Sequence, residues 1–149
     1  MNKPNNPARF LIREVSWQQA QAELREIRSC VFVEEQLVPA HLEWDGYDEN
    51  AIHLLALSSA GHAIGCARIL EKGTIGRMAV LKNYRGQGVG CTLLEQAIQC
   101  CRERGWNSIT LSAQTHAISF YERTGFVISS DEYMDAEIPH RDMQLKLSI

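Results

Sequence analysis

The stretch Ile75–Gly90, IGRMAVLKNYRGQGVG, passes from an apolar run into a glycine-rich turn, and the apolar run Val89–Ile98 follows at once. The first run predicts a β-strand over Thr74–Val80 and the second predicts a helix. Glycines let the backbone approach a ligand closely. The free N–H groups of a first helical turn point at that ligand with the positive end of the helix dipole. The order of strand, turn and helix therefore predicts an anion site, and we expect it to hold a pyrophosphate.

Two nucleotide-binding motifs fit the turn RGQGVG poorly. A phosphate-binding P-loop ends in Gly-Lys-Ser/Thr, whereas this turn ends in Val-Gly-Cys. A dinucleotide fingerprint needs glycine at its sixth position, where Cys91 stands, and an acidic residue about 20 residues further on after a second parallel strand. A glycine-rich connection that binds nothing remains the simplest alternative, because any tight turn between a strand and a helix favours glycine.

The length and composition are those of one globular domain. The chain has 149 residues, 45% hydrophobic and 22% charged, and we expect a single domain at 1–149 with a loose tail at 1–8. A net charge of −3 gives no basic face for nucleic acid. With no long apolar run and no signal peptide, we expect a cytoplasmic protein without a membrane partner. The five cysteines lack C-x-x-C spacing, so we expect neither disulfides nor a bound metal.

Hydrophobic periodicity and turn residues predict an α+β protein with helices layered on a sheet. Ser16 and Gln19 have the spacing of a capping box at the start of a helix over 17–32. Further helices are expected at 89–101 and 117–124, and the acidic segment 41–50 is expected to be a loop. Strands are expected at 9–15, 51–57, 63–70, 74–80, 108–112, 126–129 and 143–147. The prediction is a mixed, mostly antiparallel sheet of six to seven strands flanked by about four helices.

Two motifs together resemble the GNAT superfamily of acyltransferases. Arg85-x-x-Gly88-x-Gly90, after a strand and opening a helix, resembles its acetyl-CoA signature, and the stretch 121–126, YERTGF, resembles its second hallmark. The resemblance runs from about Phe10 to Leu147. Finer features are similar to the ElaA-like branch: RxxVFVxEQ at 28–36, IGR at 75–77, AQxHxxxFY at 113–121 and IPHxxM at 138–143.

The resemblance implies the GNAT acyl-CoA acyltransferase fold and direct transfer of an acetyl group from acetyl-CoA to an amine of a small molecule or peptide. It implies that backbone groups of Met78, Ala79 and Val80 pair with the pantetheine arm like an added strand. Tyr121 would lie near the CoA sulfur and protonate the departing thiolate, although it could instead only pack on the sheet. The pyrophosphate would be held by the amides of Arg85, Gly86, Gln87, Gly88, Val89 and Gly90, with a further contact from the Arg85 side chain.

Acyl transfer needs a neutral amine, so a base or a water chain must accept a proton. Glu35 and His116 are the first candidates because they lie in stretches shared with the ElaA-like branch. Each has a structural alternative, a solvated helix end for Glu35 and a backbone hydrogen bond for His116. The acidic loop at 43–49 favours a basic amine as acceptor. Further residues expected on the acceptor side are Glu34, Asp45, Asp48, His53 and Arg68.

Four alternatives stay open. The run Glu43-Trp44-Asp45-x-x-Asp48, with Arg68 downstream, is also similar to acyl-homoserine-lactone synthases, which share the core. Arg68 could instead pair with one of these acids and fix the loop. A module that binds CoA without chemistry would keep the turn but would not need the tyrosine. A homodimer through an exposed strand near the C-terminus is compatible with the sequence.

Overall fold

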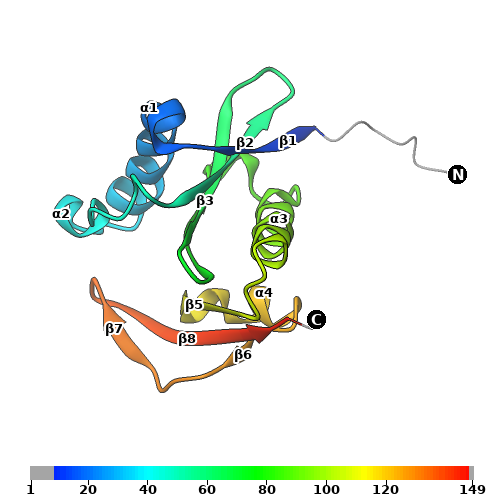
Figure 1. Cartoon of the computed structure of the whole chain (residues 1–149). Coiled ribbons are helices and arrows are strands. Elements are labelled where there is room, and N and C mark those ends of the chain that lie inside the picture. The colour runs from blue at the N-terminus through cyan, green and yellow to red at the C-terminus, as the bar shows by residue number, and fades with distance from the viewer. Residues whose placement is uncertain (1–8, 148–149) are drawn as a thin grey trace, which may run out of the picture.

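A computed structural model of the chain describes residues 9–147, so the tail expected at 1–8 lies outside the described residues. Its centre is an eight-stranded mixed sheet in the order β1-β2-β3-β4-β5-β8-β6, with β7 paired to β8 (Figure 1). Only β4 and β5 run parallel among these pairs. The strands are β1 Phe10–Val15, β2 Ile52–Ser58, β3 Ala63–Leu70, β4 Thr74–Val80, β5 Ser108–Gln114, β6 Val127–Ile128, β7 Tyr133–Asp135 and β8 Ile138–Lys146.

Helices cover both faces of the sheet, α1 and α2 on one and α3 on the other (Figure 1). Leu93, Leu94 and Ile98 of α3 pack against β2, β3, β5 and β8 in the larger core. Trp17, Leu24 and Ile27 of α1 pack against β2, β3 and β4 in the smaller one. The helices are α1 Trp17–Arg28, α2 Ala40–Glu43, α3 Val89–Glu103 and α4 Ile118–Glu122, with a π-helix, η1, over Ser29–Glu35 and 3-10 turns η2 at Lys82–Tyr84 and η3 at Thr115–Ala117.

The predicted α1 start is confirmed. Ser16 Oγ accepts from the Gln19 N–H at 3.1 Å, and Gln19 Oε1 accepts from the Ser16 N–H at 3.0 Å, which completes the capping box. The α-helix ends at Arg28, earlier than the predicted 32, and the chain continues in wider π turns to Glu35. The segment predicted as a loop at 41–50 contains most of the short helix α2.

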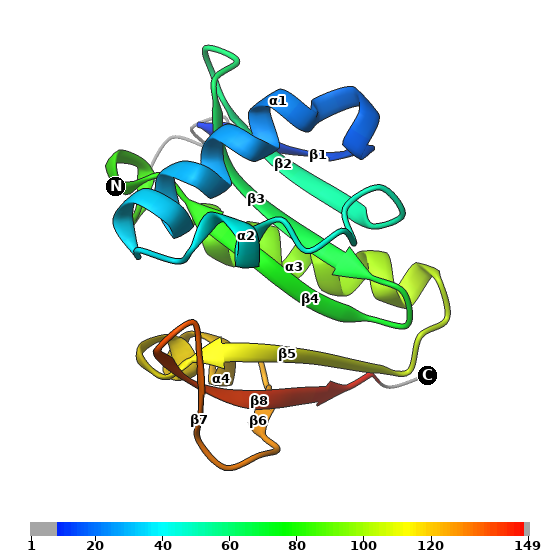
Figure 2. The same ribbon diagram turned by 90° about the vertical axis from the view of Figure 1, so that its left-hand side faces the viewer.

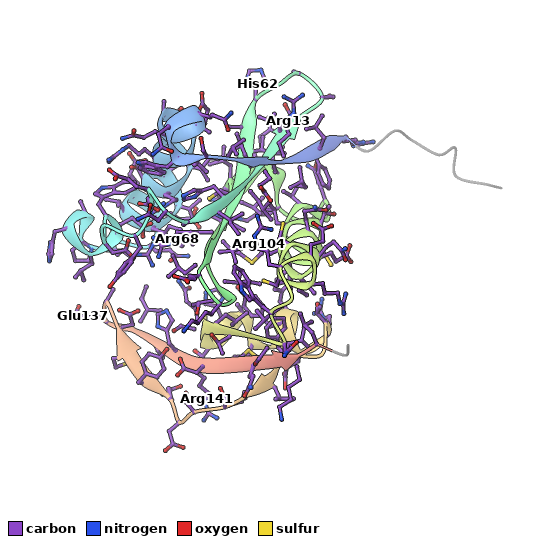
Figure 3. All side chains as sticks on the ribbon, in the orientation of Figure 1. Arg13, His62, Arg68, Arg104, Glu137 and Arg141 are labelled. Atoms are coloured by element: carbon purple, nitrogen blue, oxygen red, sulfur yellow. The ribbon has the colours of Figure 1, made fainter. Side chains whose placement is uncertain are left out.

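The prediction of a mixed, mostly antiparallel sheet is confirmed, but the strand number is eight because β7 was missed. Three residues are too few to show the alternation that identifies a strand. Ala136 and Glu137 then turn the chain with φ of 51° and 63°, a conformation usually taken by glycine or asparagine. As a result β8 begins at Ile138, five residues before the predicted start at Met143. Glu137 marks the tip of this β7–β8 hairpin (Figure 3).

The parallel pair β4 and β5 separates soon after it forms. The two strands are in register only at Thr74–Thr110 and Ile75–Leu111, and they diverge beyond this point (Figure 2). On its other side β4 pairs with β3 across an irregularity between Cys66 and Arg68, where Arg77 takes a φ of 49°. The end of β4 from Gly76 to Val80 is therefore an edge inside the sheet, without a β5 partner.

Within residues 9–147, no helix combines the length and the hydrophobicity that a bilayer span requires.

Candidate active site

Two cavities flank the unpaired end of β4. The first, about 650 Å³, surrounds the turn after β4 and is lined by residues that include Val80, Arg85, Gly86, Gly88, Gly90 and Phe120. We call it the turn cavity. The second, about 340 Å³, has Met78 of β4, Tyr121 of α4, Gln36 and the β7–β8 hairpin among its walls. We call it the cleft. Because Phe120 and Tyr121 are adjacent, α4 contributes to both cavities.

The turn itself has the geometry of an anion cradle. Gly86 and Gly88 take φ of 78° and 85°, the left-handed region that glycine enters without strain. A Cβ at either position would meet no atom within 4 Å, so backbone conformation and not packing requires glycine here. Gly88 is the N-cap of α3 and no side chain caps the helix. The first N–H groups of α3 are therefore left for another partner.

Arg85 is held in place by two parts of the chain. Its Nε donates to the Val80 carbonyl at 2.9 Å, and Nη1 and Nη2 donate to Glu35 Oε2 and Oε1 at 2.7 and 2.8 Å. The hydrogen bonds from Arg85 lower the pKa of Glu35. Both side chains are about 40% exposed, and Glu35 lines neither cavity. The structure thus brings Glu35 to the turn and not to the cleft.

Tyr121 lies in the cleft wall with its ring enclosed by aromatic neighbours. It makes edge contacts with Phe120 and Phe126 at centroid distances of 5.0 and 6.0 Å. Its hydroxyl lies 3.9 Å from Met78 Sδ at the unpaired end of β4. Burial raises the pKa of Tyr121 to about 12, so the hydroxyl keeps its proton at neutral pH. A protonated hydroxyl in this position can act as a general acid.

The predicted acceptor-side residues Asp45, Asp48 and Arg68 belong to a closed ring of ion pairs. In this ring every carboxylate lies between two arginines, at N–O distances of 2.6 to 3.2 Å. The contact of Arg77 Nε with Glu43 Oε2, at 3.0 Å, is an ion pair whose N–H direction lies outside hydrogen-bond geometry. Arg68 of β3 lies on the side of the sheet that α1 and α2 cover (Figure 3). The order around the ring is Arg28, Glu43, Arg77, Asp45, Arg68 and Asp48.

The ring fixes the loop after α2 to strands β3 and β4. Burial opposes ionisation of Asp45, but hydrogen bonds from Arg68 outweigh it and the pKa of Asp45 falls to about 2. Three carboxylates face three guanidinium groups, so the ring as a whole carries no net charge. Of these six residues, only Glu43, Arg68 and Arg77 reach the cleft wall. Arg68 therefore pairs with Asp45 and Asp48 and fixes the acidic loop, which is the structural alternative that the sequence left open for this residue.

Two other predicted acceptor-side residues lie away from the cleft. His53 is buried, its Nε2 lies 2.8 Å from the Asp48 backbone oxygen, and its ring is 5.4 Å from that of Trp17. Burial lowers the pKa of His53. Glu34 is exposed and lines neither cavity. Neither side chain reaches the cavity in which an acceptor would meet Tyr121.

His116 does line the cleft. Its Nε2 lies 2.6 Å from Gln114 Oε1, and Gln114 Nε2 donates to Gln36 Oε1 at 2.7 Å. This row of three polar side chains links β5 to the residue that follows η1. A second cleft histidine, His140 of β8, was not among the predicted site residues. Its place in the IPHxxM stretch was the only signal in the sequence.

Comparisons with known proteins agree with this geometry. The sequence profile of the acetyltransferase (GNAT) domain family matches residues 16–147. The chain belongs to the GNAT family. It is 35% identical over 121 residues to a Bacillus subtilis protein called uncharacterized N-acetyltransferase YjcF, covering 78% of this chain and 86% of that one. An acyl-CoA N-acyltransferase from Pseudomonas aeruginosa superposes with a TM-score of 0.76 at 34% identity, covering 91% and 97% of the two chains.

The resemblance to ElaA is also confirmed. Escherichia coli ElaA is 32% identical over 129 residues, which cover 80% of this chain and 83% of ElaA. Its crystal structure superposes with a TM-score of 0.81, covering 91% of this chain and 98% of that one. Membership of the GNAT family implies an acyl-CoA cosubstrate. The turn cavity fits its pyrophosphate, because the glycine turn is open and the N-terminus of α3 lacks a side-chain cap.

Proposed function

We propose that this GNAT protein transfers an acetyl group from acetyl-CoA directly to the amine of a small molecule or peptide. The observation that carries the proposal is that two cavities are lined by the unpaired end of β4, the cleft by Met78 and the turn cavity by Val80. The turn cavity suits a pyrophosphate, and the cleft on the other side offers room for an acceptor. Tyr121 and Met78 line the cleft and contact each other, which suits the site of the thioester.

The cosubstrate would bind along β4 and the turn. The backbone of Met78, Ala79 and Val80 has no β5 partner and is the natural edge for the pantetheine amides. The amides of the turn would hold the pyrophosphate, from Arg85 through Gly86, Gln87, Gly88, Val89 and Gly90. Because Arg85 is paired with Glu35, its guanidinium would contact a phosphate only by sharing or exchanging this partner.

In the transfer itself, Tyr121 would donate its proton to the departing thiolate, and a base in the cleft wall would take the proton of the amine. Of the two bases expected from the sequence, His116 lines the cleft and Glu35 does not. The position of Tyr121 favours an enzyme over a module that only binds CoA, because a buried hydroxyl at this point serves no purpose in holding the pyrophosphate.

The acceptor is an amine whose charge the acidic loop does not select. Asp45 and Asp48 are each bound by arginines, so their negative charge is compensated locally and cannot attract a cation as the sequence suggested. The remaining acid in the cleft wall is Asp135 at the end of β7. We therefore expect the cleft to accept monoamines as well as polyamines.

Two measurements with one preparation test this function. Acetyl-CoA should raise the melting temperature, because a ligand that binds the folded state stabilises it. Free CoA should then be released when benzylamine, spermidine or glycinamide is added, followed with a thiol reagent. Stabilisation without release by any of these amines would favour the binding module. An absence of both effects would contradict the pyrophosphate assignment as well.

A further inference from the structure

His140 of β8 is a buried histidine in the wall of the cleft. Only 8% of it is exposed, and it shares the cavity with Tyr121 and Met78. The strand register places it opposite Gln114 of β5 on one side and Tyr133 of β7 on the other. Paired strands therefore hold β8 on both sides at this position, which is the kind of support that a residue with a precise task needs.

One hydrogen bond sets the tautomer of His140. Its Nδ1 lies 2.6 Å from the backbone oxygen of Ile138. A carbonyl oxygen can only accept, so Nδ1 carries the proton and the neutral ring has its lone pair on Nε2. No residue in the range 9–147 makes a hydrogen bond to Nε2. Within residues 9–147, the side-chain nitrogens that are both fully buried and without a hydrogen-bond partner are Nε of Arg68 and Nε of Arg77. Nε2 of His140 also has no partner but is not among them, so part of its surface is accessible. Because His140 lines the cleft, Nε2 is the ring nitrogen that is available to accept a proton there.

The neighbouring side chains hold the imidazole ring in this orientation. The ring of Tyr133 stacks on it at a centroid distance of 6.0 Å and an interplanar angle of 20°. Tyr133 in turn donates from its hydroxyl to Asp142 Oδ1 at 2.5 Å and contacts the Ser112 hydroxyl. Asp142 lies two residues after His140 and so on the same face of β8. The stack is therefore anchored to both β5 and β8.

The two bases expected from the sequence are less well placed than His140. Both oxygens of Glu35 accept from Arg85, outside the cleft. His116 donates from Nε2 to the Gln114 side-chain oxygen, which leaves its lone pair on Nδ1, but the residue is exposed and lacks the strand pairing and aromatic stacking that hold His140. We infer that His140 is the base that accepts the amine proton through Nε2, an inference that rests on the proposed acetyl transfer.

The amine, the thioester, His140 and Tyr121 together account for every bond and proton of the transfer. The amine nitrogen forms a bond to the thioester carbonyl carbon as its proton passes to Nε2 of His140. The C–S bond then breaks, and the sulfur keeps the electron pair and takes the proton of the Tyr121 hydroxyl. His140 leaves the step as an imidazolium and Tyr121 as a phenolate. His140 then releases its extra proton to solvent, and Tyr121 takes one proton from solvent, which restores the starting state.

Several charged or titratable groups surround His140 and belong in any account of its pH dependence. Tyr133 and Asp142 flank it within the sheet. His116, Tyr121 and Asp135 share the cavity wall with it, and the ring residues Glu43, Arg68 and Arg77 line the cavity too. The paired charges of that ring compensate one another.

The test compares His140→Asn with the wild type and with His116→Asn. Asparagine can keep the hydrogen bond to the Ile138 carbonyl, because its amide nitrogen lies close to the position of Nδ1, but it offers no base. We expect His140→Asn to lower kcat/KM for benzylamine about 100-fold or more at pH 7 and to remove the acidic limb of the pH profile. His116→Asn should keep that limb. Acetyl-CoA affinity, measured by calorimetry, should be unchanged in both.

A measurement on the wild type keeps the inference testable if the asparagine variant does not fold. Long-range ¹H–¹⁵N spectra should show His140 as the Nδ1–H tautomer, with a titration midpoint equal to that of the acidic limb of kcat/KM. An Nε2–H tautomer, a mismatch of the midpoints, or a His140→Asn rate within threefold of wild type would overturn the role of His140. If wild type releases no CoA with any amine although acetyl-CoA binds, the proposed function fails first and this inference falls with it.

Discussion

The guanidinium of Arg85 donates two hydrogen bonds to the carboxylate of Glu35, a residue 50 positions earlier in the chain. The pair joins the end of η1 to the glycine turn, and the third Arg85 contact, to the Val80 carbonyl, ties it to the end of β4. Three segments that the sequence separates are thus fastened together beside the turn cavity. This arrangement gives Glu35 a structural task in positioning Arg85.

Glu35→Gln separates this task from a catalytic one. If Glu35 only positions Arg85, kcat should stay within about threefold of wild type, because no proton transfer depends on it. Acetyl-CoA should bind at least as tightly, since the change frees the Arg85 guanidinium for a phosphate and removes a nearby negative charge. Steady-state kinetics and calorimetry measure both effects. Glu34→Gln, an exposed neighbour, is the matched control. A loss of about 100-fold in kcat would instead make Glu35 the base.

Gly88→Val tests the pyrophosphate site. A valine side chain would stand in the space that the ligand must enter, and it strains a backbone held at φ of 85°. We expect acetyl-CoA binding to be abolished. Gly105→Val is the control, because Gly105 also has a positive φ of 73° and open space around it but lies at the far end of α3. Both variants should lose similar stability, measured by thermal unfolding, and only the first should lose affinity. Equal affinities would refute the assignment.

The sequence allowed the glycine turn between β4 and α3 to be predicted because its residues are local. The strand, the glycines and the start of α3 are consecutive in the chain, and their spacing alone indicates a turn with free amides. The capping box at Ser16 and Gln19 was predictable for the same reason, since its two residues are three positions apart.

The acceptor side was harder to predict because it is built by long-range contacts. Arg28 meets Glu43 and Asp48 across 15 and 20 residues, and no local pattern indicates that these charges cancel. His140 reaches the cleft only because the turn at Ala136 and Glu137 folds β7 back onto β8. That turn lacks the glycine or asparagine by which such turns are recognised. The residues that surround an acceptor therefore became visible only in three dimensions.

Tyr121→Phe isolates the general acid. Phenylalanine keeps the edge contacts with Phe120 and Phe126, so folding and acetyl-CoA affinity should be retained. The thiolate then leaves without a proton donor, and we expect kcat to fall by about 100-fold or more. Tyr84→Phe, in the lining of the turn cavity, serves as the control with a near-normal kcat.

The pH dependence gives a second test of Tyr121. Its pKa is raised to about 12 by burial, so the protonated form that acts as an acid persists below that pH. No alkaline limb from this tyrosine should appear in a kcat profile measured between about pH 6 and 10. A limb in this range that disappears in Tyr121→Phe would show that the hydroxyl titrates more easily than its burial predicts.

The ion-pair ring should dominate the stability of the loop after α2. Arg28 is 1% exposed and bridges Glu43 and Asp48, so Arg28→Met leaves two buried carboxylates with only one arginine partner each, Arg77 for Glu43 and Arg68 for Asp48. We expect a loss of about 3 to 5 kcal/mol in the free energy of unfolding, measured with urea at pH 7. The control is Arg104→Met, which removes an exposed pair with Glu14 at 3.5 Å and should cost at most about 1 kcal/mol. Similar losses in the two variants would contradict the importance of the ring.

The same ring predicts how stability changes with acid. An unperturbed aspartate has a pKa of 3.8, and in the folded protein the pKa of Asp45 is lowered to about 2. The ionised Asp45 therefore contributes fully to the free energy of unfolding above pH 3.8, and this contribution is lost as the pH falls toward 2. Unfolding free energies measured from pH 5 to pH 2 should therefore fall steeply in the wild type. Asp45→Asn, which cannot titrate, should show a shallower decline over this window. Parallel curves for the two proteins would mean that Asp45 is not held as a carboxylate by Arg68 and Arg77.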